Sequence, residues 1–344
     1  MKLCITGGGT GGHLMIAEAL VEAAVKRGHE LIFIGSASGQ DKKYFQTHSS
    51  FSHVYFLKTT GVVNQKGLKK LLALYKIFIA FLKARYLLKK HKIQAVYSVG
   101  GFSAAPASFA SLSKFIPLFI HEQNAVVGRL NAILKPFSKS FISAYDDTLS
   151  ITNIKGYPVK EIFYKKARVR HKLKTIIFLG GSHGAKAIND LALRIVLDLN
   201  NLNIKIIHQA GENDFYRVKK EYERLGVDVE LYSFTNNLAN LIIESDLAVS
   251  RAGASTLWEL TTNGCPALYI PYPYAASDHQ YHNAEFIIKN EMGWRQREDE
   301  NLKSVLIEIL KQTNLEQKSE KLLKYSNKDV ADKMIKEVED NIIK

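Results

Sequence analysis

Two glycine-rich loops in this chain have the residue types and spacing needed to hold an anionic ligand. The first follows an apolar run, Lys2 to Thr6, and reads Gly7-Gly8-Gly9-Thr10-Gly11-Gly12-His13 before a helix-like segment begins. The second, residues 180–185, follows the apolar run 176–179. Glycine lets a ligand approach bare backbone, and the N–H groups that open the next helix attract negative charge. We therefore expect two nucleotide-binding-type units that face each other across a cleft.

His13 stands where the first of these helices begins. The positive end of the helix dipole favours the neutral imidazole, and a neutral imidazole at the mouth of a cleft can act as a general base. The same histidine could instead do no more than hydrogen-bond its own loop. The specialised sequence around it favours the catalytic interpretation.

The spacing Gly7-x-Gly9-x-x-Gly12 also matches the dinucleotide-binding fingerprint. That fingerprint needs an acidic residue at the end of the second strand, which holds a ribose hydroxyl. Here the apolar run 31–34 ends in Gly35-Ser36. The sequence therefore disfavours a hydride-transfer enzyme.

A polar turn in the second half has the character of a nucleotide site. It follows the apolar run 247–249 and reads Ser250-Arg251-Ala252-Gly253-Ala254-Ser255-Thr256. Backbone N–H groups, the hydroxyls and Arg251 could all face an anion there. Glu259, one turn into the next helix, could accept hydrogen bonds from the ribose of a nucleotide whose phosphates lie at the helix start. A charge near a helix start is also common without any function.

A proline-containing loop, 271–280, ends in His279 and Gln280, which suit sugar hydroxyls. The sequence has no Asp-x-Asp pair and no His/Cys cluster at zinc spacing. We therefore expect no metal and no cofactor. The helix N-termini would then stabilise the charge of a leaving group.

Short β-rich runs alternate with helical patterns along the whole chain, as in parallel sheets with helices on both faces. The predicted strands are 2–6, 30–35, 53–57, 95–99, 117–121 and 140–144, then 175–179, 204–208, 229–232, 247–250 and 267–270. We expect an α/β fold with two Rossmann-like, doubly wound parallel-sheet domains, residues 1–157 and 158–324. The C-terminal helix, about 325–344, is expected to pack back on the first domain.

Positive charge is concentrated in the first half. Residues 1–158 hold 20 Lys and Arg against 7 Asp and Glu, a balance of +13, whereas the remainder holds 27 against 26. A long predicted helix, 66–92, has one apolar stripe that can pack on a sheet, Leu68, Leu71, Leu72, Tyr75, Phe78, Ile79 and Leu82. A second stripe, with Leu74, Ile77, Phe81 and Leu88, is surplus and is flanked by cations, Lys69, Lys70, Lys76, Lys83, Arg85, Lys89 and Lys90. An apolar patch with surrounding cations predicts contact with an anionic membrane, although a helix buried on both sides would look the same.

The two cysteines, Cys4 and Cys265, lie in or beside apolar runs, so no disulfide framework is expected. No signal peptide and no apolar stretch of membrane-spanning length is apparent. A reducing cytoplasm is the natural location for such a chain.

Taken together, these motifs resemble the MurG family, the bacterial UDP-N-acetylglucosamine:lipid I transferases of peptidoglycan synthesis. The resemblance covers nearly the whole chain and is carried by residues 6–13, Gly100-Gly101-Phe102-Ser103-Ala104-Ala105-Pro106, His121-Glu122-Gln123-Asn124, Gly180-Gly181-Ser182-x-Gly184-Ala185, residues 250–254, and His279-Gln280 before Asn283-Ala284. It implies a GT-B type fold and, with the basic apolar helix, peripheral attachment to the cytoplasmic face of the inner membrane. The implied reaction moves N-acetylglucosamine (GlcNAc) with inversion to the C4 hydroxyl of the N-acetylmuramic acid (MurNAc) of lipid I, and gives lipid II.

The resemblance also implies roles for individual residues. His13 is the candidate base. The UDP-GlcNAc contacts would be Thr10, Gly11, Gly12, Asn124, Lys160, Ser182, Thr235, Arg251, Gly253, Ala254, Ser255, Thr256, Glu259 and Gln280. The acceptor, lipid I, would lie near Gly8, Gly9, Gly100, Gly101 and Glu122. Lys160 stands where the family usually has Arg, which keeps the charge but loses the bidentate geometry.

Three alternatives stay open at this point. A transferase of the same fold could use another lipid acceptor. A related fold serves UDP-N-acetylglucosamine 2-epimerase, which needs no lipid, and the basic apolar helix argues against it. A nucleic-acid-binding protein would also be basic, but the aromatic residues of the basic region have helical core spacing rather than the arrangement of a stacking surface. No nucleic acid partner is therefore expected.

Overall fold

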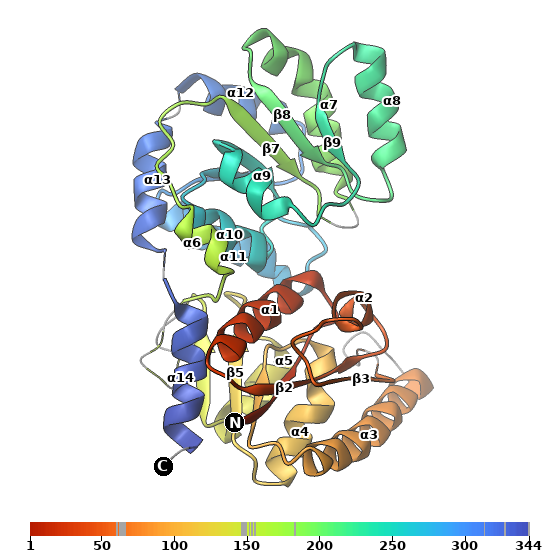
Figure 1. Cartoon of the computed structure of the whole chain (residues 1–344). Helices are drawn as coiled ribbons and strands as arrows, with labels where there is room; N and C mark the ends of the chain where they lie inside the picture. The colour runs from red at the N-terminus through yellow and green to blue at the C-terminus, as the bar shows by residue number, and fades with distance from the viewer. Residues whose placement is uncertain are drawn as a thin grey trace. The chain divides into compact units, whose positions relative to one another are not determined.

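The structure is a computed structural model. It describes the chain except residues 60, 62–66, 146–149, 151, 153, 155, 182, 183, 313, 327, 343 and 344, and it leaves the side chains of 68–70 and 312 undescribed. The chain divides into two compact units, Met1–Lys160 with Asn327–Lys344 (unit 1) and Glu161–Ser326 (unit 2) (Figure 1).

Unit 1 is built on a parallel sheet in the order β3-β2-β1-β4-β5-β6. Its strands are β1 Lys2–Thr6, β2 Glu30–Ser36, β3 His53–Leu57, β4 Ala95–Ser98, β5 Leu118–Glu122 and β6 Ser140–Ser143. Its helices are α1 Gly11–Lys26, α2 Asp41–Phe45, α3 Gly67–Lys90, α4 Ala105–Ser113, α5 Arg129–Leu134 and α14 Val330–Ile342, with short 3₁₀ turns at Phe102–Ala104 and Lys135–Phe137. The strand order reverses between β1 and β4, the point where such sheets bind ligands.

Unit 2 repeats this topology in the order β12-β11-β10-β7-β8-β9. Its strands are β7 Thr175–Leu179, β8 Lys205–Gln209, β9 Glu230–Tyr232, β10 Leu247–Ser250, β11 Ala267–Tyr269 and β12 Trp294–Arg295. Its helices are α6 Glu161–Lys165, α7 Lys186–Asn201, α8 Phe215–Leu225, α9 Leu238–Glu244, α10 Ala254–Asn263, α11 His279–Lys289, α12 Leu302–Gln312 and α13 Leu315–Lys324, with a 3₁₀ turn at Ala276–Asp278. Here the order reverses between β7 and β10.

The prediction of two doubly wound parallel sheets is confirmed. Each predicted strand range holds a strand whose ends differ by no more than one residue. The chain also forms β12, which the sequence analysis did not predict. This strand has only two residues, so it gives no alternating or β-branched pattern that could be recognised.

The last helix, α14, belongs to unit 1 and packs against α1. The Arg27 guanidinium lies 3.0 Å from Asp332 and 2.9 Å from Glu339, and His29 Nε2 lies 2.8 Å from Glu339. Val330, Met334, Ile335 and Val338 are buried. Ion pairs and an apolar face together hold the end of the chain on unit 1.

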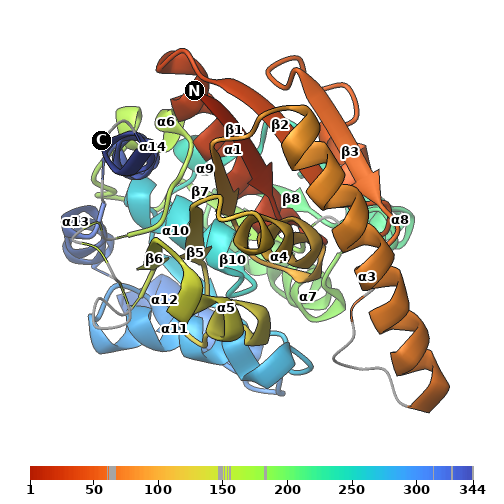
Figure 2. The ribbon, with the colours of Figure 1, turned by 90° about the horizontal axis from the view of Figure 1, so that it is seen from below.

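Helix α3 packs on α4 at one face of the sheet, and Figure 2 shows the two helices there. The residues that α3 buries are small at its centre, Ala73, Ala80 and Ala84, with Leu87 and Leu88 near its end. Phe81 packs against the buried apolar core of unit 1 to which most of these residues belong, and Ile77 is half-buried. Apart from Leu68, whose side chain is not described, every residue of the stripe predicted to pack on the sheet is exposed, so that expectation is wrong. Alanine at these positions lets α3 lie close to α4, whose residues are mostly small.

Candidate active site

The glycine-rich loops that follow β1 and β4 contact each other through their backbones. Gly8 N–H donates to the carbonyl of Gly100 at 3.2 Å. A Cβ at Gly7 would lie 2.6 Å from Gly100 O, and one at Gly101 would collide with Gly8 O. Gly101 also has φ of +80°, where side chains are strained. Only glycine lets the loops that follow β1 and β4 approach this closely.

Asp41, the first residue of α2, holds the first loop from the other side. Its carboxylate accepts hydrogen bonds from the N–H groups of Gly9 and Ser36, the latter at 2.7 Å. Burial raises the pKa of the Asp41 carboxyl above its usual value. The N–H groups of Gly8 and Gly9 are thus hydrogen-bonded within the protein. An acceptor substrate, which we predicted to lie near these two glycines, would have to contact other groups of the loop. The sequence analysis missed Asp41, since nothing in the sequence brings a residue 32 positions away to Gly9.

His13 lies in the first turn of α1 and is bonded on both ring nitrogens. Nδ1 lies 2.9 Å from the hydroxyl of Thr10, and Nε2 lies 2.9 Å from the amide of Gln123. Thr10 is the N-cap residue, but its hydroxyl makes no capping bond to the helix backbone. The loop hydroxyl and the Gln123 amide, which is carried by the chain after β5, therefore fix the orientation of the imidazole. Gln123 belongs to the motif at residues 121–124, but nothing in the sequence indicated a contact with His13.

Glu122 ends β5 and is buried beneath the loop that follows. Its carboxylate accepts hydrogen bonds from Asn124 N–H at 3.0 Å, Gly128 N–H at 2.9 Å and Asn131 Nδ2 at 2.8 Å. The side chain is only 2% exposed, and burial raises its pKa. This geometry gives Glu122 the task of shaping the loop that carries Asn124, and it makes Glu122 a poor candidate for direct contact with an acceptor.

Tyr157 and Lys160 close this part of unit 1. The Tyr157 hydroxyl donates to Gly12 O at 3.5 Å, and Lys160 Nζ lies 3.7 Å from Glu18 of α1. The half-exposed ammonium of Lys160 is thus held beside α1.

In unit 2 the second glycine loop follows β7. Gly180 N–H donates to Gln209 O at 3.0 Å, and a Cβ at Gly184 would lie 2.5 Å from Ala210 O. The loop is thus fitted to the end of β8. Ser182, predicted to bind the donor pyrophosphate, and His183 lie outside the described residues.

The turn after β10 leads into α10 as predicted. Gly253 is the N-cap, and its extended backbone opens the helix at Ala254. The Ser255 hydroxyl donates to Glu259 Oε1 at 2.9 Å, and both residues are 8% exposed. Ser255 thus orients the carboxylate predicted to hold a ribose. Thr256 is half-buried on the same first turn.

Arg251 is tied into the frame of this site. Its guanidinium donates to the carbonyls of Ile270 at 3.1 Å and Pro271 at 3.4 Å, and it forms an ion pair with Glu298. Arg251 therefore fixes the loop that follows β11. These contacts explain the position of Arg251 without a bound anion, and its contact with an anion stays a prediction.

Gln280 and Thr235 belong to two further loops of unit 2. Gln280 Oε1 accepts a hydrogen bond from Tyr272 N–H at 2.9 Å, and the neighbouring Asn283 donates to Ala252 O at 3.2 Å. The Thr235 hydroxyl, after β9, accepts from Asn237 N–H at 3.0 Å. The predicted donor residues of unit 2 thus follow the carboxyl ends of its strands. Thr10, Gly11, Gly12, Asn124 and Lys160 belong to unit 1, and their contact with a donor stays a prediction.

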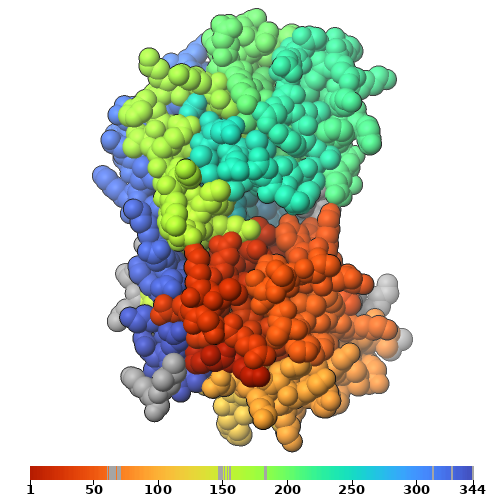
Figure 3. Space-filling view, viewed as in Figure 1, coloured from red at the N-terminus to blue at the C-terminus, as the bar shows by residue number. Residues whose placement is uncertain are grey.

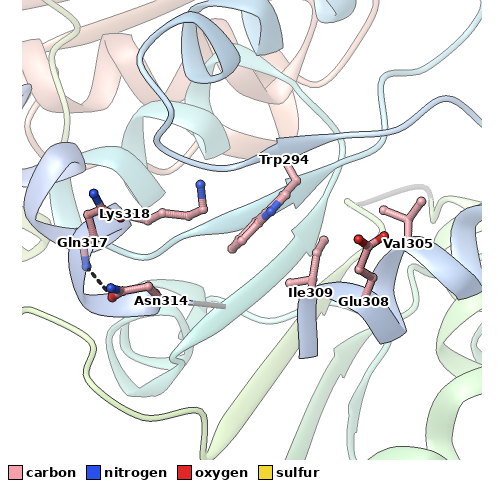
Figure 4. Close-up of a pocket in the computed structure, with 7 residues that line it drawn as sticks. All are labelled: Trp294, Val305, Glu308, Ile309, Asn314, Gln317 and Lys318. Atoms are coloured by element: carbon pink, nitrogen blue, oxygen red, sulfur yellow. Dashed lines mark hydrogen bonds between the residues drawn. The ribbon is translucent and has the colours of Figure 1, made fainter. Parts of the chain in front are cut away.

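A pocket of about 400 Å³ opens elsewhere on unit 2 (Figure 4). It is lined by Trp294, Val305, Glu308, Ile309, Asn314, Gln317 and Lys318. None of the predicted donor or acceptor residues lines it, so it is not part of the predicted site. Across the described residues, no group of three His, Cys, Asp or Glu side chains could hold a metal, and no helix is long and apolar enough to cross a membrane.

Comparison with known proteins gives concordant matches over both units. The N-terminal domain model of glycosyltransferase family 28 matches residues 3–143, and the C-terminal domain model of that family matches residues 175–341. A curated protein of Sulfurimonas denitrificans is 65% identical over 98% of this chain and 98% of its own length. One of Wolinella succinogenes is 52% identical over 97% and 98%. Both are named UDP-N-acetylglucosamine–N-acetylmuramyl-(pentapeptide) pyrophosphoryl-undecaprenol N-acetylglucosamine transferase.

Solved structures agree with these matches. The crystal structure of Acinetobacter baumannii MurG aligns with a TM-score of 0.77 and 26% identity over 99% of both chains. Staphylococcus aureus MnaA in complex with UDP aligns with a TM-score of 0.68 over 100% of this chain and 97% of its own, at 12% identity. The latter likeness concerns the fold alone.

Proposed function

Because the chain belongs to glycosyltransferase family 28 and is a glycosyltransferase of GT-B type, we propose that it makes lipid II. In this proposal the donor is UDP-GlcNAc, and the acceptor is the MurNAc C4 hydroxyl of lipid I. Support comes from two relatives that are 65% and 52% identical over nearly the whole chain and carry the name of this transferase. The single observation that carries the mechanism is the double anchoring of His13 at the start of α1.

The reaction is a displacement with inversion at the anomeric carbon. His13 takes the proton of the acceptor hydroxyl, the oxygen bonds to the anomeric carbon of GlcNAc, and the bond from that carbon to the UDP oxygen breaks. General-base catalysis of this kind contributes roughly 10²–10⁴-fold to the rate.

Unit 2 supplies the donor site in this proposal. Glu259, oriented by Ser255, holds the ribose, and Thr235 lies at the uracil. The N-terminus of α10, from Gly253 to Thr256, receives the pyrophosphate, together with Ser182. Backbone N–H groups and the helix dipole stabilise the charge that UDP carries away, so no metal is needed.

The outer surface of α3 is proposed as the membrane-docking surface. Eight large side chains there are each at least 45% exposed: Leu71, Leu72, Leu74, Tyr75, Phe78, Ile79, Leu82 and Tyr86. Exposed Lys76, Lys83, Arg85, Lys89 and Lys90 stand among them. Residues of α3 lie at the surface of unit 1 in the space-filling view (Figure 3). Of the second stripe predicted from the sequence, Leu74 belongs to this surface. Ile77 is half-buried, Phe81 packs against the buried core of unit 1, and Leu88 is buried.

An apolar surface with cations around it favours the headgroup region of an anionic bilayer. The aliphatic residues of this surface favour a bilayer over a nucleic acid, whose bases stack on aromatic side chains beside basic residues. We therefore propose peripheral attachment to the cytoplasmic face of the inner membrane.

Sedimentation with vesicles tests the docking surface. The double variant Phe78→Ser/Leu82→Ser should bind phosphatidylglycerol vesicles at least about 10-fold more weakly, since each fully buried large apolar side chain contributes about 1.5–3 kcal/mol. Tyr216→Ser, at an 82% exposed position of unit 2, is the matched control and should bind like the wild type. Equal binding of both variants to these vesicles would contradict the proposed surface.

The base role is tested by His13→Ala. Transfer of GlcNAc should fall by at least about 100-fold, while UDP-GlcNAc binding, measured by calorimetry, should stay unchanged. Near-normal turnover by this variant would remove His13 from the mechanism.

A further inference from the structure

The two nitrogens of His13 face different surroundings. Nδ1 is hydrogen-bonded to the hydroxyl of Thr10, which is an exposed residue. Nε2 is hydrogen-bonded to the amide of Gln123, which is only 6% exposed. Gly100 lies against the same inner edge of the ring, since a Cβ added there would lie 3.4 Å from both Cδ2 and Nε2 of His13. The inner edge is thus covered by protein, and the outer edge carries Nδ1.

This placement decides which nitrogen a substrate hydroxyl can reach. A base needs a lone pair on the accessible side, and a neutral imidazole carries one proton and one lone pair on opposite nitrogens. A lone pair at Nδ1 therefore requires the proton at Nε2. The Nε2–H then needs an acceptor within the protein.

Gln123 can be that acceptor. Its Oε1 is buried without a hydrogen-bond partner in the present amide orientation, in which the amide nitrogen faces His13. A half turn of the amide leaves its shape almost unchanged and puts Oε1 against Nε2. The amide can thus hold either tautomer, and only the turned orientation leaves His13 able to act as a base on its accessible side.

We propose that Gln123 is a positioning residue, which holds His13 as the Nε2–H tautomer so that the acceptor proton is taken at Nδ1, beside Thr10. This inference rests on the proposed function. As the acceptor O–H bond breaks, a second N–H bond forms at Nδ1, and the oxygen bonds to the anomeric carbon while UDP leaves. The resulting imidazolium points its Nε2–H at Gln123 Oε1.

The neighbouring charged groups fit this assignment. Glu122 precedes Gln123 in the chain, and its carboxylate is held by three donors of its own loop. His121 interacts electrostatically with His13, but burial lowers the pKa of His121 to about 3, so it is neutral in the assay range. A neutral amide orients His13 without the strong attraction for an imidazolium that a carboxylate would add.

Two variants at Gln123 test the proposal. Gln123→Met has a similar volume but no hydrogen bond, and its kcat should fall roughly 10- to 100-fold with UDP-GlcNAc binding unchanged. Gln123→Glu restores an acceptor for Nε2–H and adds a charge. It should recover part of the activity, and the acidic limb of kcat/KM should move to higher pH by about one unit. Turnover at the wild-type level in Gln123→Met, or equal losses in both variants with an unmoved acidic limb, would overturn the proposal.

A spectroscopic measurement on the unmodified enzyme does not depend on the folding of a variant. With isotope-labelled histidine, the resonances of His13 are assigned by difference from His13→Asn. The proposal expects the Nε2–H tautomer at neutral pH, and a dominant Nδ1–H tautomer would contradict it. Wild-type turnover by His13→Ala would defeat the base role itself. An inactive His13→Ala with wild-type pH profiles at both Gln123 variants would defeat only the positioning role.

Discussion

Gly101→Ala should damage the acceptor half of the site far more than an ordinary glycine substitution does. At φ of +80° an alanine is strained by roughly 1 kcal/mol. Its Cβ would also collide with the backbone oxygen of Gly8, which cannot move aside as a flexible side chain could. We expect the loop that carries Gly8 and Gly9 to be displaced, with a total cost of about 2–4 kcal/mol in the free energy of unfolding.

Gly28→Ala is the matched control. Gly28 belongs to the same unit and has φ of +74°, but a Cβ there would meet nothing within 4 Å. This variant should therefore lose only about 1 kcal/mol and keep full transferase activity. The difference between the two variants isolates the contact between the loops after β1 and β4.

Urea unfolding and steady-state transfer assays give the two readouts. Gly101→Ala should lose GlcNAc transfer by at least about 10-fold while UDP-GlcNAc binding, which the proposal assigns largely to unit 2, stays close to normal. If Gly101→Ala and Gly28→Ala prove equally stable and equally active, the interlocking of the two glycine loops has no bearing on function, and this reasoning is refuted.

Three further predictions concern buried positions. Arg170→Met should lower the free energy of unfolding by about 3 kcal/mol or more, because the fully buried guanidinium donates to the carbonyls of Arg168, Ser245 and Asn263; the exposed Arg194→Met should lose little in the same urea titration. His208→Gln should flatten the pH dependence of the free energy of unfolding. Burial lowers the folded pKa of His208 to about 3, so below pH 6.5 the unfolded chain binds a proton that the folded chain does not, and the wild type loses about 2 kcal/mol of stability at pH 5. An unchanged slope between pH 7 and 5 in the variant would contradict this. Ala84→Leu should overfill the contact of α3 with α4 and cost about 1–3 kcal/mol, whereas Tyr86→Leu, at a 62% exposed position, should be near neutral by thermal unfolding.

The sheets were predictable because their strands are short, apolar and separated by helical patterns. A central strand such as β10, with every residue buried, is recognised from composition alone. The glycine loops were predictable for another reason. Several of their residues have positive φ, which favours glycine, so runs of glycine in the sequence mark where such loops lie.

The packing of α3 was not predictable from hydrophobicity. Large apolar residues were expected inside, but the helix buries Ala73, Ala80 and Ala84 and exposes Leu71 and Phe78. Hydrophobicity measures what favours burial, whereas the distance between two packed helices decides which volumes fit. That distance is a property of the tertiary structure.

Asp41 and Gln123 escaped prediction because their partners are distant in sequence. Gln123 meets His13 across 110 positions, and neither the type of residue nor the spacing signals that contact. Only the neighbouring positions of the parallel strands β1, β4 and β5 bring the two residues together.

The most direct test is a transfer assay with the purified chain, labelled UDP-GlcNAc and a lipid I analogue in the presence of EDTA. Label should move to the lipid at a rate that EDTA does not change, and His13→Ala should stop the transfer while it still binds the donor. Bound donor without any transfer of label to the lipid would contradict the proposed acceptor. Transfer abolished by EDTA would contradict the role given to the N-terminus of α10.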